Sequence, residues 1–167
     1  MASNYLEQLV SEWYEYQGYF IRRNVMVGKL PKGGYECELD VVAFHPETKH
    51  LVHIEPTHDA HSWDKREQRF IKKFNAGRQY IPEIFKGMDI PENIEQICLL
   101  GFGNNTNHPI LAGGKVITVA ELLVEIIQTI GVKSMHRNAM SENHPMLRTL
   151  QFMTQNKKLF ADLLGRI

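Results

Sequence analysis

Apolar positions along the first third of the chain follow first a helical period and then strand periods. Residues 5–17 carry apolar side chains at helical spacing and stop at Gly18, a pattern that predicts a helix. Residues 20–27 and 36–44 read as strands joined by a Gly-rich loop, and residues 51–57 form the next apolar run after a short turn. We therefore expect three strands linked as antiparallel hairpins.

The remaining pattern predicts helices and strands in alternation. A long helix is expected over residues 62–85, and residues 94–102 are apolar enough for a strand that is buried on both faces. A short strand over 115–119 leads into a helix at 120–131, and a terminal helix is expected over 145–165. The order predicts an α/β fold with a mixed central sheet of about five strands flanked by helices. The expected core face of the long helix consists of Phe70, Phe74, Gly77 and Ile81.

Length and composition favour one soluble domain. The 167 residues are 43% hydrophobic and 23% charged, which is close to the globular average. The sequence shows neither a run of apolar residues long enough to cross a membrane nor a secretory leader, and its two cysteines are too few to staple a fold. We expect a cytoplasmic protein without membrane contact. Residues 1–132 are expected to form the main domain, and residues 133–167 a linker and a C-terminal helix packed on it.

Charge is unevenly distributed although 19 basic residues balance 19 acidic ones. Residues 36–59 carry six acids against one base, whereas residues 64–86 carry seven bases against three acids. An acidic centre followed by a basic helix suits a cation site with a polyanion laid over it. Solvated helix faces that happen to be basic would give the same pattern.

Acidic side chains recur on one face of two neighbouring strands. Glu38 and Asp40 are two residues apart, and Glu55 shares a face of the third strand with His53 and Thr57. If these strands pair, Asp40 and Glu55 converge at one end of the sheet, where two carboxylates repel unless a cation intervenes. Mg²⁺ prefers oxygen ligands and uses one or two protein carboxylates. The alternative is that these acids are exposed on the outer face of an edge hairpin.

The order and spacing of these motifs resemble the PD-(D/E)xK nucleases, which have the restriction-endonuclease-like fold. Within this superfamily, the sequence most resembles the branch of small Holliday-junction-resolvase-like proteins. Glu7 lies in the first helix before Gly18-Tyr19, Glu38-Leu39-Asp40 matches the E-x-D strand, and residues 51–55 match the apolar strand that ends in the second acid. The resemblance covers about residues 5–130, and it implies a Mg²⁺- or Mn²⁺-dependent endonuclease acting on DNA.

The resemblance also implies roles for individual acids. Asp40 and Glu55 would hold the metal ion, with the carbonyl oxygen of Pro56 as a further ligand. Glu7 would act through water or a second ion. Glu38 would help to position the metal-binding side chains without itself binding the metal ion. A bound metal ion of this kind activates a water molecule and offsets charge on the phosphodiester.

One motif position departs from the family. Thr57 stands where the family has a lysine, and a short neutral hydroxyl cannot replace an ammonium group. One explanation is that the basic or polar group has moved to the following helix, where Lys65, Gln68 and Lys72 share a stripe; Lys65 or Gln68 would then stand in for the lysine. The other is that catalysis has been lost. His58, next to Thr57, would touch a phosphate or assist proton transfer, or else simply pack.

The resemblance implies nucleic acid as the partner, with double-stranded or branched DNA as the expected substrate. Many nucleases of this fold act as dimers, so a homodimer is among the expectations. The alternative function is a catalytically inactive nuclease-like module that binds DNA or a protein partner in a phage, repair or defence system. Basic side chains expected to contact phosphates without reading sequence are Lys65, Arg69, Lys72 and Lys73.

Overall fold

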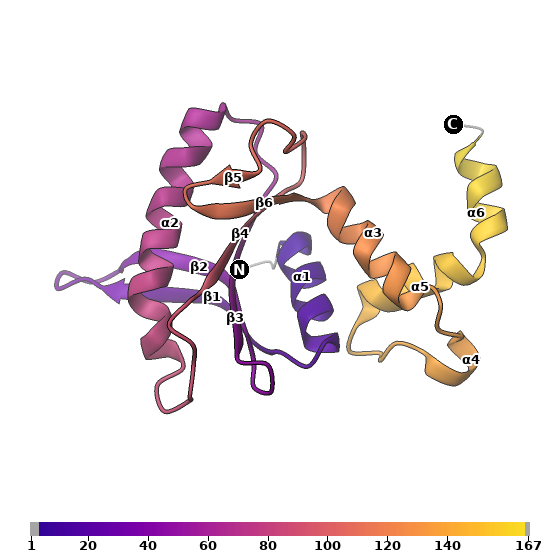
Figure 1. Ribbon diagram of the computed structural model, residues 1–167, viewed down its shortest axis with the longest axis horizontal. Coiled ribbons are helices and arrows are strands. Elements are labelled where there is room, and N and C mark those ends of the chain that lie inside the picture. Colours follow the sequence, from indigo (N-terminus) through magenta and orange to yellow (C-terminus); the bar gives the residue numbers. More distant parts are fainter. Residues whose placement is uncertain (1–3, 166–167) are drawn as a thin grey trace. The chain divides into compact units, whose positions relative to one another are not determined.

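The computed structural model describes residues 4–165, which divide into two compact units at Val119 and Ala120. The first unit holds two long helices and a sheet (Figure 1). Its helices are α1 (Tyr5–Tyr16) and α2 (Trp63–Ile84). Its strands are β1 (Phe20–Lys29), β2 (Tyr35–His45), β3 (His50–Thr57), β4 (Glu95–Leu100), β5 (Ile110–Leu111) and β6 (Gly114–Thr118).

The sheet is mixed, as expected, but it has six strands in the order β1-β2-β3-β4-β6-β5. β1, β2 and β3 pair antiparallel, while β4 pairs parallel with both β3 and β6. The expectation of about five strands missed β5, which pairs antiparallel with β6. A strand of two residues is too short to give a periodic signal.

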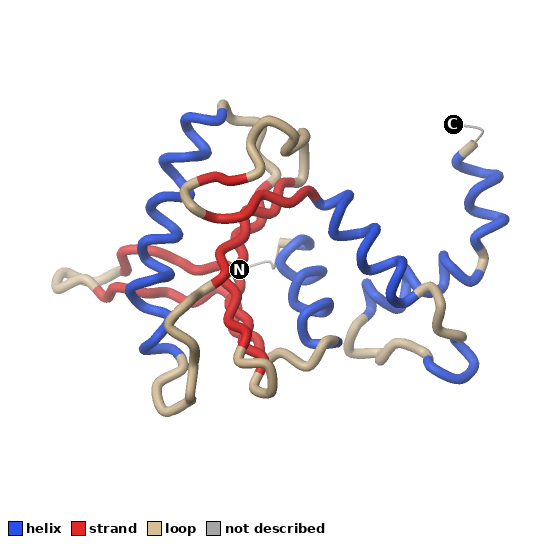
Figure 2. Tube along the Cα trace, in the orientation of Figure 1, coloured by secondary structure: helices blue, strands red, loops and turns tan. Residues whose placement is uncertain are grey.

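Helices α1 and α2 lie on opposite faces of the sheet (Figures 1 and 2). The expected core face of α2 is confirmed, because Phe70, Phe74 and Ile81 are fully buried. Gly77 lets α2 approach β3 closely: a Cβ atom there would lie 2.3 Å from Nδ1 of His53. The sequence therefore brings the middle of α2 directly over the polar side chains of β3.

The side-chain alternation of β2 shifts at its centre. Leu39 and Val42 pack in the same hydrophobic cluster beneath α2 although they are three positions apart. The residue opposite Asp40 in β1 is Asn24, which has a positive φ of 51°. This local distortion occurs where the paired ladder of β2 and β3 ends, at Val41 and Ile54, so the two strands separate beside Asp40.

The second unit is helical, with α3 (Val119–Ile130), α4 (Met135–Asn138), α5 (Pro145–Gln155) and α6 (Lys157–Leu164). The buried amide of Gln151 organises it, donating to the carbonyl oxygens of Lys133 and Asn138 and accepting from the amide of Met140. The expected terminal helix is two helices that meet at Asn156, and α4 lies in the expected linker. Within residues 4–165, no helix is both long and apolar enough to span a membrane.

Candidate active site

Asp40 and Glu55 meet where β2 and β3 separate, as the strand pattern predicted. The backbone amide of Asp40 donates to Oε1 of Glu55 at 3.1 Å. Glu55 is completely buried, whereas the Asp40 side chain keeps 14% of its surface exposed. Register and strand ends thus place two carboxylates together, one at the bottom of the site and the other at its opening.

Lys73 of α2 reaches both carboxylates. Its Nζ lies 2.7 Å from Oδ1 of Asp40 and 2.8 Å from Oε2 of Glu55, and it also donates to the backbone carbonyl oxygen of Glu38. Lys73 was expected to contact DNA, and Lys65 or Gln68 to replace the family's lysine. The helix instead brings Lys73 to the acids. Lys73 lies three residues after Phe70 and four before Gly77, so a lysine bordering the core face was the available signal.

His53 holds Glu55 from the other side. Its Nε2 lies 2.8 Å from Oε1 of Glu55, and its Nδ1 lies 3.3 Å from Nε2 of Gln96. The ring also packs edge-on against Phe74, with centroids 5.5 Å apart. His53 is fully buried, so it positions the Glu55 carboxylate. Its place two residues before Glu55, on the same face of β3, was the sequence signal for this contact.

The two carboxylates hold their protons unequally. Burial, reinforced by the nearby negative charge of Glu55, raises the pKa of Asp40 from 3.8 to about 7 despite the opposing charge of Lys73. Burial also opposes ionisation of Glu55, but the hydrogen bond and charge of His53 and the charge of Lys73 hold the pKa of Glu55 below its usual range. The charges of Glu55 and Asp40 outweigh burial and raise the pKa of Lys73. The negative charge therefore stays on the buried Glu55, and the proton that the pair retains is held by Asp40, the carboxylate nearer to solvent.

Stability without divalent metal should depend on pH through Asp40. Because the pKa of Asp40 is about 7 in the folded protein and near 3.8 in the unfolded chain, the folded state binds the extra proton between these values. The free energy of unfolding should therefore fall by roughly 2 kcal/mol as pH rises from 5 to 7, and level off above pH 7.5. Urea denaturation across this range measures it. Asp40→Asn should remove the slope, and an unchanged slope would assign it to another group.

Thr57, at the position of the missing lysine, belongs to a separate network. Its hydroxyl donates to Oδ2 of Asp59 at 2.7 Å and accepts from Nη1 of Arg69 at 3.0 Å. Arg66, which is buried, pairs with Oδ1 of Asp59 at 3.0 Å. Although burial opposes ionisation, the hydrogen bonds from Thr57 and Arg66 lower the pKa of Asp59. The network ties the end of β3 to the first turns of α2, so Thr57 has a structural partner in place of a catalytic one.

The carboxylate of Glu7 contacts a residue outside the acid pair. Its Oε2 accepts from the side-chain amide of Asn24 at 2.9 Å, and Asn24 is the residue opposite Asp40 in β1. Glu7 is therefore joined to the neighbourhood of Asp40 through Asn24, a residue for which the sequence carried no signal. Pro56 lies in β3 opposite Leu99, and the role of its carbonyl oxygen stays a prediction.

His58 turns out to be packed between rings. Tyr5 and Phe102 lie with their ring centroids 4.9 Å and 5.4 Å from that of His58. Its Nε2 is buried and has no hydrogen-bond partner among residues 4–165. These contacts agree with the packing alternative for His58, while its contact with a phosphate stays a prediction.

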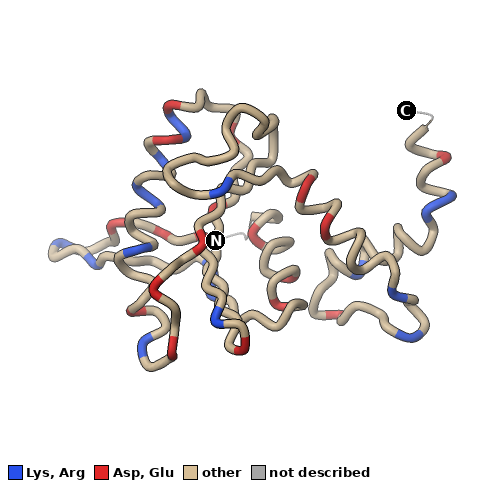
Figure 3. Tube along the Cα trace, viewed as in Figure 1, with Lys and Arg blue, Asp and Glu red and all other residues tan. Residues whose placement is uncertain are grey.

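A basic hollow of about 770 Å³ opens beside the acid pair. It lies between α2 and the hairpin of β1 and β2, and Lys73 belongs to its lining. Figure 3 marks the Lys and Arg positions along the backbone of α2 in blue. All of the side chains expected to contact phosphates, together with Gln68, line this hollow: Lys65, Gln68, Arg69, Lys72 and Lys73.

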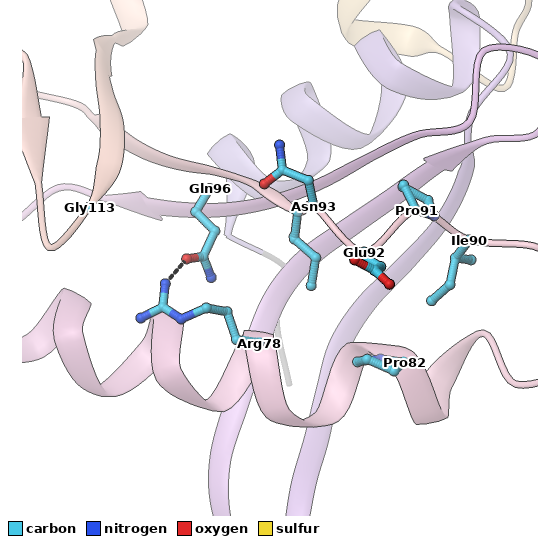
Figure 4. Close-up of a pocket in the computed structure, with 9 residues that line it drawn as sticks. Arg78, Pro82, Ile90, Pro91, Glu92, Asn93, Gln96 and Gly113 are labelled. Carbon is cyan, nitrogen blue, oxygen red and sulfur yellow. Dashed lines mark hydrogen bonds between the residues drawn. The ribbon is translucent and has the colours of Figure 1, made fainter.

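A second hollow, of about 520 Å³, lies near the C-terminal half of α2. Arg78 donates to the side chain of Gln96 across it, and Pro82, Pro91 and Glu92 form part of its wall (Figure 4). Arg78 also donates to Asn75 at 2.6 Å. Its guanidinium is thus held within the fold, and this hollow offers a single cation that is already hydrogen-bonded.

The acid pair suits a hard divalent cation. Asp40 and Glu55 offer carboxylate oxygens, and Oε2 of Glu55 is buried with no hydrogen-bond partner of good geometry among residues 4–165, although Nζ of Lys73 lies close to it. Mg²⁺ commonly uses only one or two carboxylates and keeps several waters. Within the described residues, no group of three or more His, Cys, Asp and Glu side chains is placed to hold a metal ion. Asp40 and Glu55 would therefore have to bind the ion without a third such side chain.

No protein-family model, curated protein or solved structure matches this chain.

Proposed function

We propose that this protein is a Mg²⁺- or Mn²⁺-dependent nuclease that hydrolyses DNA phosphodiesters. The observation that carries the proposal is the meeting of Asp40, Glu55 and Lys73 at the edge of a basic hollow. Two carboxylates and a lysine are the side chains of the PD-(D/E)xK motif that the sequence resembles. In this chain, the lysine comes from α2 in place of Thr57.

The mixed sheet with helices on both faces supports a restriction-endonuclease-like fold. In the proposed site, Asp40 and Glu55 hold the metal ion, with Pro56 as a further ligand through its carbonyl oxygen. The bound ion would activate water and offset charge on the phosphate. No part of this assignment requires Thr57, whose hydroxyl is engaged by Asp59 and Arg69.

The chain's own residues have distinct tasks in this proposal. His53 orients the Glu55 carboxylate through a 2.8 Å contact. Lys73, at 2.7 Å from Asp40, is positioned to leave the carboxylates when a cation binds and to stabilise negative charge on the phosphate. The cations of the hollow bind the phosphate backbone without reading sequence.

The experiment that tests the proposal is calorimetric titration of Mn²⁺ beside a plasmid-nicking assay, on wild type and Asp40→Asn. We expect Mn²⁺ binding and nicking in the wild type, with both at least about a hundredfold weaker in the variant, because Mg²⁺-like ions depend on very few protein carboxylates. Asp89→Asn is the matched control, since Asp89 pairs with Lys49 at 3.1 Å and lies outside both the acid pair and the hollow. Failure of the wild type to bind Mn²⁺ would overturn the proposal.

The inactive nuclease-like module is a second candidate, and one observation favours it. Lys73 already pairs with both carboxylates, so the acids have a compensating charge without any metal ion. In this case the wild type would bind DNA in a salt-sensitive manner, with neither Mn²⁺ binding nor nicking, and Asp40→Asn would bind DNA as well as the wild type does.

A further inference from the structure

The two walls of the basic hollow differ in chemistry. The α2 wall presents the exposed cations Lys65 and Lys72, together with Arg69, which also pairs with Asp59 at 2.7 Å. The opposite wall, formed by the hairpin of β1 and β2, presents Met26 and Tyr35. A groove that combines a positively charged side with an aromatic side is the arrangement by which proteins hold single-stranded nucleic acid.

Tyr35 is available as a stacking surface. Tyr35 keeps 47% of its surface exposed, and Met26 keeps 43%. Among residues 4–165, the ring of Tyr35 has no aromatic contact, whereas Tyr14 and Tyr19 pack edge-on against each other with centroids 4.9 Å apart. Leaving an apolar ring and a thioether exposed to solvent costs free energy, part of which a stacked base would recover.

We propose that the hollow binds an unpaired stretch of nucleic acid, with phosphates along α2 and a base stacked on Tyr35. This inference rests on the proposed function and names the form of its substrate. Lys73 lines the hollow and also contacts Asp40 and Glu55. A phosphate held along α2 would therefore lie beside the acid pair.

Charge on the hairpin wall orients the strand. Glu36 and Glu38 line the same wall as Tyr35, and their carboxylates repel phosphates from it while accepting hydrogen bonds from base amino groups. Tyr80 donates to Oε2 of Glu36 at 2.7 Å, which holds that carboxylate in place. A bound strand would thus lie with its phosphates on the helix side of the hollow and its bases on the hairpin side.

An intact duplex cannot contact the cations of α2 with its phosphates and at the same time stack a base on Tyr35. Its bases are stacked on one another, so a protein ring reaches a base face only after the base has been unstacked, at a cost of a few kcal/mol. An unpaired strand presents base faces freely, and stacking tolerates any sequence because every base has a π-face. A branch, a flap or a single-stranded end would each supply such a stretch.

The test is fluorescence anisotropy with a labelled 12-nucleotide thymidine strand and a hairpin duplex of matched length, both in EDTA so that no cleavage occurs. We expect the wild type to bind the single strand about tenfold more tightly than the duplex, and Tyr35→Ala to lose about tenfold in single-strand affinity. Tyr35→Phe, which keeps the ring, should bind as the wild type does. Tyr5→Ala is the matched control, since Tyr5 is similarly exposed, at 54%, but lies outside the hollow.

Two outcomes would overturn the inference: a preference for the duplex, or single-strand binding that Tyr35→Ala weakens no more than Tyr5→Ala does. Circular dichroism of each variant checks that the hairpin still folds. Failure of the proposed function gives a different result, because single-strand binding would still depend on Tyr35 while the wild type failed to bind Mn²⁺ and to nick DNA.

Discussion

Lys73→Met should reduce the rate of DNA nicking by about a thousandfold while leaving Mn²⁺ affinity equal to or above that of the wild type. The ammonium group of Lys73 lies within 2.8 Å of both carboxylates, so a metal ion must compete with it for them. Removing it frees the ligands but takes away the cation that would stabilise charge on the phosphate. Nicking rates at saturating Mn²⁺, together with calorimetric titration, separate these two effects.

The same substitution should also destabilise the metal-free protein. Asp40 and Glu55 would be left without the partner that offsets their repulsion, and loss of one member of a buried ion pair commonly costs about 3 kcal/mol. Saturating Mn²⁺ should restore most of this loss, because a bound cation replaces the missing charge. Urea denaturation with and without Mn²⁺ measures the recovery.

Lys65→Met and Lys72→Met are the matched controls for Lys73. Both lysines line the hollow and are exposed. Each substitution should weaken DNA binding and reduce its salt dependence, with nicking at saturating DNA close to that of the wild type. If Lys65→Met abolished nicking while Lys73→Met did not, the catalytic cation would be Lys65, as the sequence alone suggested.

Glu55→Gln should abolish detectable nicking, by at least about a thousandfold, and weaken Mn²⁺ binding by at least about a hundredfold. Glutamine keeps the shape of the side chain and an oxygen that can accept from the Asp40 amide, so the fold should survive with a loss of about 1–3 kcal/mol. The variant should also lower the pKa of Asp40, because the charge of Glu55 is one of the causes that raise it to about 7.

Nicking, Mn²⁺ titration and urea denaturation on Glu55→Gln measure these effects. Glu12→Gln is the matched control, because Glu12 of α1 is also fully buried but accepts from Gln8 and lies outside the hollow. Nicking by Glu55→Gln at the wild-type rate would show that Glu55 supports the fold and takes no part in the chemistry.

Several features were readable from the amino-acid pattern. The alternation of carboxylates with apolar residues in β2, and of polar with apolar residues in β3, predicted the convergence of Asp40 and Glu55, because strand side chains repeat every two residues and a hairpin defines which positions face each other. The helical spacing of Phe70, Phe74 and Ile81 predicted which side of α2 enters the core. These are local periodicities, which depend on backbone geometry alone.

Other features depended on distances between elements. Lys65, Lys72 and Lys73 are equally basic in the sequence, and although the spacing from Phe70 places Lys73 beside the core face, the docking of α2 on the sheet decides that it reaches the acids. That docking depends on Gly77, where any side chain would collide with His53, and it carries Nζ of Lys73 to the carboxylates while Lys65 and Lys72 line the hollow. The contact between Asn24 and Glu7 and the packing of His58 between Tyr5 and Phe102 likewise join residues far apart in the chain.

Where the longer helices and strands of the first unit lie, and which two acids face each other, therefore follow from spacing along the chain, since hydrophobic period and hairpin register are local properties. Which lysine meets those acids, and how the walls of the hollow oppose each other, follow from the packing of α2 against β2 and β3. A helix can rotate or slide by a few ångströms without changing its own pattern, so close packing against the sheet is needed to bring Lys73 onto the two carboxylates.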